Sequence, residues 1–209
     1  MTDTPTRRRA TFNTLKVKNV RKLTSDSVEV VFEVPTDLVD DYNYVPGQYV
    51  ALRATIDGQE VRRSYSICSE PIPGEVHVAI KKDFGGLFST WANTELKEGD
   101  EIDVMNPQGA FVSKKNITSM NNPEEVAKDA VAEGNLNLVA FAAGSGITPI
   151  MSIARSVLRQ SADSTFDLVY ANKSAMDVMF AEEIGDLKDK YPQRFAVHHV
   201  LSREQRVSP

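Results

Sequence analysis

Two patterns of apolar residues divide the chain, and they restrict its fold more than any other feature. From residue 11 to about 112, short runs with alternating apolar residues are separated by turn residues every ten or so positions. That alternation is typical of antiparallel strands. Later in the chain the apolar runs are almost continuous, as in parallel strands covered on both faces. The sequence therefore predicts an antiparallel domain followed by a parallel α/β domain.

Six strands are expected in the first domain, separated by Gly and Pro turns whose dihedrals strands do not use. They cover residues 15–20, 28–34, 49–54, 63–68, 76–82 and 101–105. This spacing predicts a closed or nearly closed six-stranded antiparallel β-barrel. Leu87 and Trp91 stand at helical spacing, so a short helix is expected within residues 86–96.

The second domain is expected to be a partial parallel α/β domain. Strands are predicted at 136–143, 166–171 and 196–201, with helices at 149–160 and about 179–190. Parallel sheets normally need more strands and helices than these to bury both faces. The sequence is therefore expected to be a fragment that lacks part of this domain.

The expected division has four parts: a flexible tail at 1–10, the barrel at 11–112, a polar linker at 113–137 and the truncated domain at 138–209. The formal net charge of -5 gives no field suited to a phosphate backbone, so nucleic acid is not an expected partner. One cysteine cannot form an intramolecular disulfide, and no apolar stretch is long enough to span a membrane, so the cytoplasm is expected and a membrane is not. No metal site is expected, because adjacent His198 and His199 on a strand point to opposite faces.

The strongest local motif lies on the fourth predicted strand. Arg63 offers a cation for phosphates, Tyr65 a flat ring and Ser66 a small hydrogen-bonding group, which together suit a flavin nucleotide. Alternate residues of a strand share a face, so Arg63 and Tyr65 point the same way. The alternative interpretation is an exposed polar strand with a buried tyrosine.

A second motif follows about fifteen residues later. A strand runs into Gly85 and Gly86 and then into a helix, so that backbone N–H groups and the positive helix end can approach a pyrophosphate. Ser89 is placed to donate a hydroxyl there. A plain turn is the alternative, but one nucleotide lying across the barrel explains both motifs.

The third motif is a parallel strand that ends in Gly144-Ser145-Gly146 and leads into a helix near Pro149. The third glycine of the dinucleotide fingerprint is absent, which weakens the case for an ordinary dehydrogenase. A serine hydrolase would need glycines two residues before and after Ser145, where Ala143 and Ile147 stand. A phosphate or nicotinamide role is therefore favoured.

In this order the motifs resemble those of the ferredoxin-NADP reductase superfamily, and within it most closely the reductase subunits of phenylacetyl-CoA epoxidases. The resemblance runs from about residue 12 to 205. It is carried by residues 46–48, 63–68, 85–89, 107–111, 144–149, 170–173, 179–180 and 187–191.

The resemblance implies FAD on the barrel, with Arg63 at the pyrophosphate, Tyr65 beside the isoalloxazine and Ser66 near its N5. The residues expected to bind the flavin are Arg63, Ser64, Tyr65, Ser66, Ile80, Lys81, Gly85, Gly86, Leu87, Phe88 and Ser89.

The resemblance likewise implies NADPH on the second domain, where the expected residues are Gly144, Gly146, Ile147, Thr148 and Pro149, with Thr148 nearest the nicotinamide. Ser202 and Arg203 match the pair that holds the 2′-phosphate in NADP-using relatives. Tyr65, Ser66 and Thr148 are the expected catalytic residues.

By the same resemblance, hydride passes from NADPH to the flavin, and single electrons then pass to a [2Fe-2S] centre of an oxygenase complex or a ferredoxin-type acceptor. Members of the subfamily carry that cluster in a C-terminal domain whose four cysteines this sequence lacks, so a [2Fe-2S] cluster is expected only in a missing C-terminal domain. FMN in place of FAD, a non-catalytic flavin-binding module and a flavin-free dehydrogenase remain alternatives.

Overall fold

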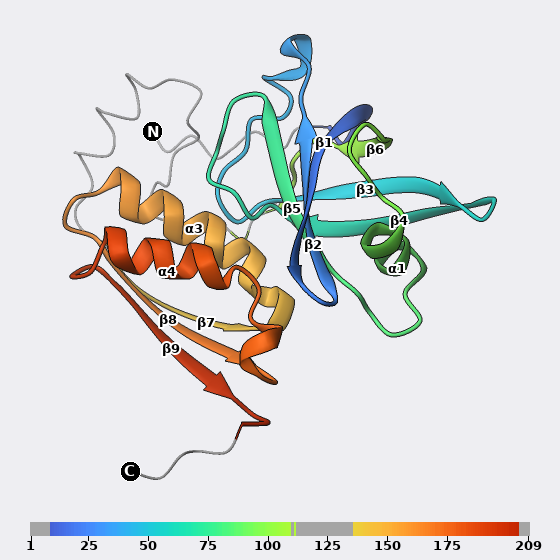
Figure 1. Ribbon diagram of the computed structural model, residues 1–209. Coiled ribbons are helices and arrows are strands. Elements are labelled where there is room, and N and C mark those ends of the chain that lie inside the picture. Colours follow the sequence, from blue (N-terminus) through green and yellow to red (C-terminus); the bar gives the residue numbers. More distant parts are fainter. Residues whose placement is uncertain (1–8, 110, 112–135, 205–209) are drawn as a thin grey trace.

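The first half of the chain forms a six-stranded antiparallel sheet that curves into a half-barrel (Figure 1). In this computed structural model, residues 9–109, 111 and 136–204 are described. The strands are β1 (Phe12–Thr24), β2 (Ser27–Glu33), β3 (Tyr49–Ile56), β4 (Gln59–Ser66), β5 (Glu75–Lys81) and β6 (Glu101–Met105), in the order β4-β3-β6-β1-β2-β5. Just beyond the end of β4, the Cys68 amide donates to the His77 carbonyl of β5 at 2.9 Å. The two outer strands thus approach each other at this point, and the predicted six-stranded antiparallel architecture is confirmed as a half-barrel.

Two strands are displaced from their predicted limits. β1 is longer because its first part, up to Lys16, pairs with β6 and its remainder, from Lys16 onward, pairs with β2. β4 begins four residues earlier than predicted. Asp57 and Gly58, both with positive φ, form the two-residue turn that starts the β3–β4 hairpin. Backbone pairing within a hairpin does not need the apolar residues on which the prediction depended.

Helix α1 (Leu87–Thr94) caps the barrel, close to its predicted position. It inserts Phe88, which is fully buried, into the barrel core. That core is built from alternate residues of the strands, among them Leu15, Val17, Val30, Phe32, Val50, Leu52, Val78 and Ile80.

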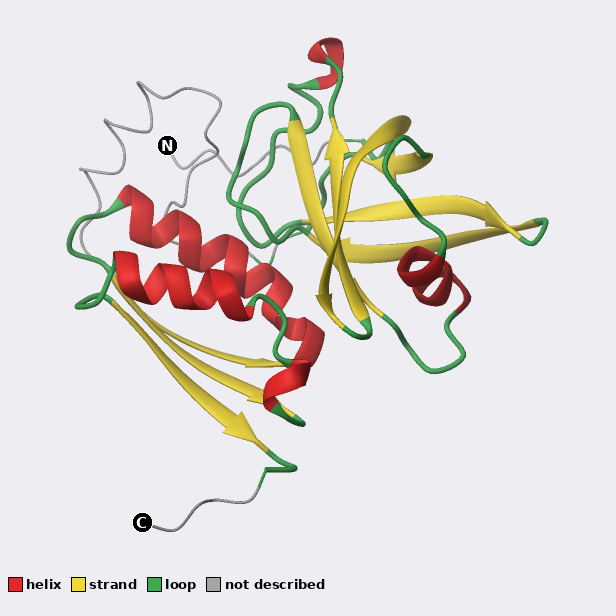
Figure 2. Cartoon of the chain, viewed as in Figure 1, coloured by secondary structure: helices red, strands yellow, loops and turns green. Residues whose placement is uncertain are grey.

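The second half is a parallel sheet of three strands that are connected in sequence by helices, as predicted (Figure 2). The elements are β7 (Asn137–Ala143), α3 (Ile147–Gln160), β8 (Thr165–Asn172), α4 (Ala181–Lys190) and β9 (Phe195–Leu201), with short 3-10 turns at Thr36–Leu38 (η1), Gly144–Gly146 (η2) and Ala175–Asp177 (η3). Helix α3 begins two residues before the predicted start at Pro149, because a helix tolerates proline in its first turn, where no amide donor is needed.

Both long helices lie on one face of the parallel sheet (Figure 1). Strand order β7-β8-β9 advances in one direction, and right-handed crossovers then place successive helices on the same side. Val139 and Phe141, which lie on the other face, are 62% and 76% exposed. The predicted cover on both faces is therefore not found in the described part of the chain.

The barrel and the parallel sheet share an apolar cluster. Cys68 and Ala79 of the barrel pack with Ile147, Met151 and Ala154 of α3. The predicted tail up to residue 8 and the predicted linker up to residue 135 lie outside the described residues. Among the helices that are described, none has the length and apolar character needed to cross a membrane.

Candidate functional site

The motif on β4 lies next to helix α1. The Tyr65 ring is half-buried, and its centroid lies 5.8 Å from that of Phe88. Burial, with a smaller contribution from the nearby Asp83 carboxylate, raises the pKa of the Tyr65 phenol to about 12, while the Arg63 guanidinium opposes the rise. The Asp83 and Arg63 charges thus lie close enough to shift the pKa of the phenol. The strand motif and the glycine-turn motif therefore meet around the Tyr65 ring.

Arg63 is exposed, and its Nη1 donates to the Arg62 carbonyl at 2.7 Å. Ser64 is also exposed, and Ser66, at the end of β4, is partly buried opposite Tyr49 of β3. The cation and the small hydroxyl groups of this strand are therefore accessible to a ligand.

The glycine turn between β5 and α1 is held by its own hydrogen bonds. The Ser89 hydroxyl accepts from the Asp83 amide at 3.0 Å and donates to the Gly86 carbonyl at 3.3 Å. A Cβ on Gly86 would stand 2.5 Å from the Ser89 Oγ, so a larger residue here would have to displace this hydroxyl. Ser89 is predicted to donate to a phosphate, and the structure places its hydroxyl inside this turn, at the N-terminal end of α1.

The turn fits the phosphates of a flavin nucleotide. No side chain caps the N-terminus of α1, and its first turn holds no acidic residue, so no side chain of this helix end competes with an anion for the leading amides. Ile80 is buried in the barrel core beneath the turn, while Lys81 pairs with Asp26 at 3.2 Å. An exposed guanidinium, a half-buried ring and an uncapped helix end together form a set that suits FAD.

The second glycine turn lies between β7 and α3. Gly144 has φ +49, and its carbonyl accepts a 3.0 Å hydrogen bond from the Tyr170 hydroxyl of β8. Thr148 is buried, and its hydroxyl donates to the Ser145 carbonyl at 3.0 Å. The N-terminus of α3 has neither a side-chain cap nor an acidic residue in its first turn. These residues fit the phosphates of a nicotinamide nucleotide.

The pair proposed for a 2′-phosphate lies just past the end of β9. Ser202 and Arg203 are exposed, and their amides donate to the carbonyls of Asn172 and Lys173 at 3.0 and 2.8 Å. These bonds bring the ends of β8 and β9 together at the carboxyl edge of the parallel sheet, where nucleotides bind in such folds.

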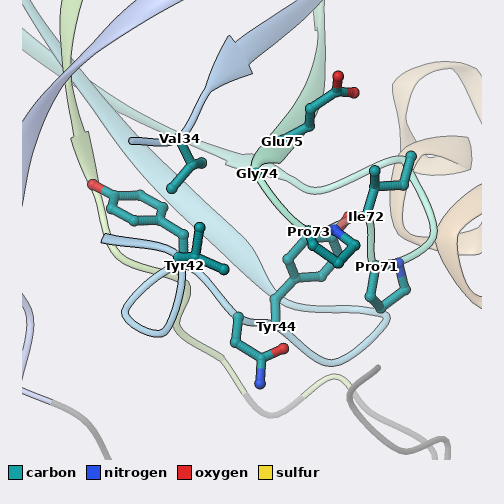
Figure 3. A pocket seen from close by; sticks show the side chains of 10 residues that line it. Val34, Tyr42, Tyr44, Pro71, Ile72, Pro73, Gly74 and Glu75 are labelled. Atoms are coloured by element: carbon teal, nitrogen blue, oxygen red, sulfur yellow. The ribbon is translucent and has the colours of Figure 1, made fainter. Parts of the chain in front are cut away.

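The cavity in Figure 3 lies away from these motifs, next to the end of β2 and the start of β5. Its volume is about 10 Å³, which is space for one water molecule at most. Tyr42 and Tyr44 line it, and their hydroxyls bond the carbonyls of Val104 and Glu70. It is part of the barrel packing and not the candidate site.

Sequence reasoning missed a charged cluster between the two domains. Arg21 of β1 pairs with Glu29 of β2 at 2.6 Å and also with Glu183 of α4. Burial alone would raise the pKa of the Glu29 carboxyl, but His77 and Arg21 outweigh it and lower that pKa to about 2. Arg21 and Glu183 are 162 positions apart, so no local pattern could have indicated the pair.

Fold and site together define an oxidoreductase with a flavin-binding barrel and a nicotinamide-binding domain. Residues 14–112 match the family described as oxidoreductase FAD-binding domain, and residues 141–208 match the oxidoreductase NAD-binding domain. The chain belongs to the ferredoxin reductase-like family of FAD- and NAD(P)-binding reductases, and it carries the domains of an NAD(P)H-dependent flavin reductase.

Two curated relatives illustrate the likeness. The chain is 39% identical over 194 residues to one of the subunits of 1,2-phenylacetyl-CoA epoxidase from Escherichia coli strain K12, a match that covers 93% of this chain and 50% of the relative. It is 35% identical over 193 residues to the ferredoxin reductase component of 3-ketosteroid-9-alpha-monooxygenase from Rhodococcus rhodochrous, covering 91% and 50%. The chain thus spans about half the length of the curated relatives it matches.

Solved structures share the fold at lower identity. The FAD/NAD binding domain of nitric oxide dioxygenase from Vibrio cholerae aligns with a TM-score of 0.72 at 23% identity, over 93% of this chain and 80% of that one. A ferredoxin NADP+ reductase from Neisseria gonorrhoeae, solved with FAD and NADP, aligns with a TM-score of 0.69 at 19% identity, over 95% and 70%.

Proposed function

We propose that this chain binds FAD and NADPH side by side and is the reductase part of a cytoplasmic oxygenase system. When bound, FAD accepts a hydride from NADPH and releases electrons one at a time, a chemistry that no side chain supplies. Residues 11–112 are the proposed flavin domain and residues 138–209 the proposed nicotinamide domain.

On the flavin side, Arg63 binds the pyrophosphate, Tyr65 packs against the isoalloxazine and Ser66 hydrogen-bonds near its reacting edge. Support comes from the meeting of Tyr65 with Phe88 of α1, which brings the strand motif against the glycine turn. Because the Tyr65 phenol stays protonated up to high pH, it can donate a hydrogen bond without titrating.

On the nucleotide side, the uncapped turn from Gly144 to Pro149 binds the phosphates and the nicotinamide, with Thr148 nearest the ring. Ser202 and Arg203 hold the 2′-phosphate, because a hydroxyl and a guanidinium together suit a dianion. NADPH is then preferred over NADH.

The proposed acceptor is a [2Fe-2S] centre that serves an oxygenase. The relatives' names support this, since one belongs to an epoxidase and the other is a ferredoxin reductase component of a monooxygenase. An aromatic-CoA oxygenase acting on phenylacetyl-CoA is the specific proposal, and it rests on the 39% identity.

The observation that carries the proposal is the meeting of the Arg63–Ser66 strand with the Gly86 turn around one half-buried ring. The test is a visible spectrum of the purified protein, followed by anaerobic addition of NADPH and mass spectrometry of the extracted flavin. We expect FAD bands that bleach. A colourless protein that still binds NADP, or a yellow one that NADPH leaves unchanged, would contradict the proposal; a mass equal to that of FMN would correct the cofactor.

A further inference from the structure

Helix α3 presents a row of polar side chains to the barrel. Ser152, Arg155 and Arg159 are spaced by three and four residues, so they share one face of the helix. The Ser152 hydroxyl donates to the Ser69 carbonyl at 2.5 Å, and Arg155 Nη1 donates to the Cys68 carbonyl at 3.3 Å. Arg159 Nε lies 3.0 Å from a Glu70 carboxylate oxygen. One helix face therefore holds three consecutive barrel residues, 68 to 70.

Both ends of this contact lead directly to a proposed cofactor site. Residues 68–70 follow the flavin strand β4, which ends at Ser66. Helix α3 follows the glycine turn, and Ser152 lies five residues, or about 8 Å, along the helix from its first residue, Ile147. A single rigid element thus joins the turn proposed for the nicotinamide to the strand proposed for the isoalloxazine.

The contact is dry at its centre. Ser152 and Cys68 are fully buried, and Ser69 is 2% exposed. Water is therefore excluded from the carbonyl that Ser152 satisfies, and loss of the hydroxyl would leave that carbonyl unpaired. The Arg159 pair is more exposed, with 35% of the arginine side chain accessible, and surface pairs of this kind contribute little. Ser152 and Arg155 are accordingly the important members of the row.

We propose that Ser152 and Arg155 are positioning residues for hydride transfer, because they fix the strand bearing Tyr65 and Ser66 relative to the turn bearing Thr148. The inference rests on the function proposed above. Hydride transfer requires the reacting atoms about 3 to 3.5 Å apart, and a displacement of about 1 Å can cost about 100-fold in rate. Neither residue belongs to the proposed cofactor sites, so each acts through the backbone carbonyl that it holds.

The experiment compares Ser152→Ala and Arg155→Gln with the wild-type full chain, and it uses Ser156→Ala as the matched control. Ser156 is equally buried on the same helix, but its hydroxyl donates within the helix, to the Ser152 carbonyl at 2.8 Å. The measurements are single-turnover flavin reduction by saturating NADPH in anaerobic stopped flow, the charge-transfer absorbance before reduction, the FAD content and the NADPH dissociation constant.

We expect Ser152→Ala and Arg155→Gln to reduce flavin about 10- to 100-fold more slowly with a weaker charge-transfer band, at unchanged FAD content and NADPH affinity. Ser156→Ala should behave as wild type, and Arg155→Lys, which keeps a donor, should recover part of the rate lost in Arg155→Gln. Equal rates for Ser152→Ala and Ser156→Ala, or slow reduction explained by lost FAD, would overturn the positioning role alone. A wild-type protein that holds FAD but is not reduced would overturn the proposed function, and the positioning role with it.

Discussion

The two glycine turns look alike in sequence but differ in what requires their glycines. In the barrel turn, a Cβ on Gly86 would collide with the Ser89 hydroxyl, so the protein's own packing favours glycine. In the turn before α3, a Cβ on Gly146 would meet nothing within 4 Å among the described residues, and the backbone there has ordinary helical dihedrals. Nothing in the described fold excludes a side chain at Gly146.

This contrast separates two reasons for keeping a glycine. Gly86 maintains the shape of a turn that offers helix amides to a ligand, whereas Gly146 leaves room that a ligand itself can fill. Substitution at the first should therefore damage fold and flavin binding together. Substitution at the second should damage nucleotide binding alone.

The largest effect should come from the cation beside the first turn. Arg63→Ala removes a charge-assisted bond to the flavin phosphates, which is worth about 1.5 to 3 kcal/mol, so FAD affinity should fall about 10- to 100-fold. Flavin content after dialysis measures it. Full occupancy in this variant would show that the phosphates bind elsewhere.

Gly86→Ala should destabilise the barrel. The added methyl would displace Ser89 from the Asp83 amide, and overpacking of this kind costs about 1 to 3 kcal/mol. Urea unfolding of the flavin-free protein, followed by FAD titration, measures both consequences. A variant as stable as wild type would remove the claim that packing fixes this glycine.

Gly146→Ala should leave the fold intact, with the free energy of unfolding changed by less than about 1 kcal/mol. The methyl would stand where the nucleotide approaches, so the NADPH dissociation constant should rise about tenfold. Unchanged NADPH affinity would erase the distinction between the two turns.

Arg203, just past the end of β9, is the cation proposed for the nicotinamide nucleotide, and it is exposed. Arg203→Ala should weaken NADPH about fivefold, equivalent to about 1 kcal/mol, and leave NADH almost unaffected. Steady-state reduction with each nucleotide measures this. An equal loss for both would remove the 2′-phosphate assignment.

The smallest effect is expected from Tyr65 titration. Its pKa is raised from 10.0 to about 12, so the stabilisation of the protonated phenol is fully present below pH 10 and is lost as the pH rises towards 12. Between pH 7 and 10, Tyr65→Phe should not alter the shape of the pH profile of flavin reduction. A titration step between pH 7 and 10 that is present in the wild type and absent in Tyr65→Phe would contradict the raised pKa of Tyr65.

Local sequence patterns were enough to predict the strands, the capping helix and both glycine turns, because alternation and turn residues act within a few positions. The same patterns could not predict the hydrogen bond of Ser152, because its partner is a backbone carbonyl 83 positions away. They also did not indicate that the Ser89 hydroxyl accepts a hydrogen bond from the Asp83 amide, because that bond depends on how the turn folds back on the helix.

The sheet faces illustrate the same limit. Val139 and Phe141 belong to a continuous apolar run that predicts burial on both sides, yet the structure exposes both. An apolar run shows that both faces of the strand can be buried. The handedness of the crossover connections decides which face the helices actually cover.

The rate at which the single cysteine of the chain is modified can report how often the two domains separate. Cys68 lies under α3 with no exposed surface, and burial raises its pKa above the ordinary value. A thiol reagent can reach it only when the helix lifts from the barrel. The speed of its modification, with and without nucleotide, therefore reports how often the two halves part, without any engineered label.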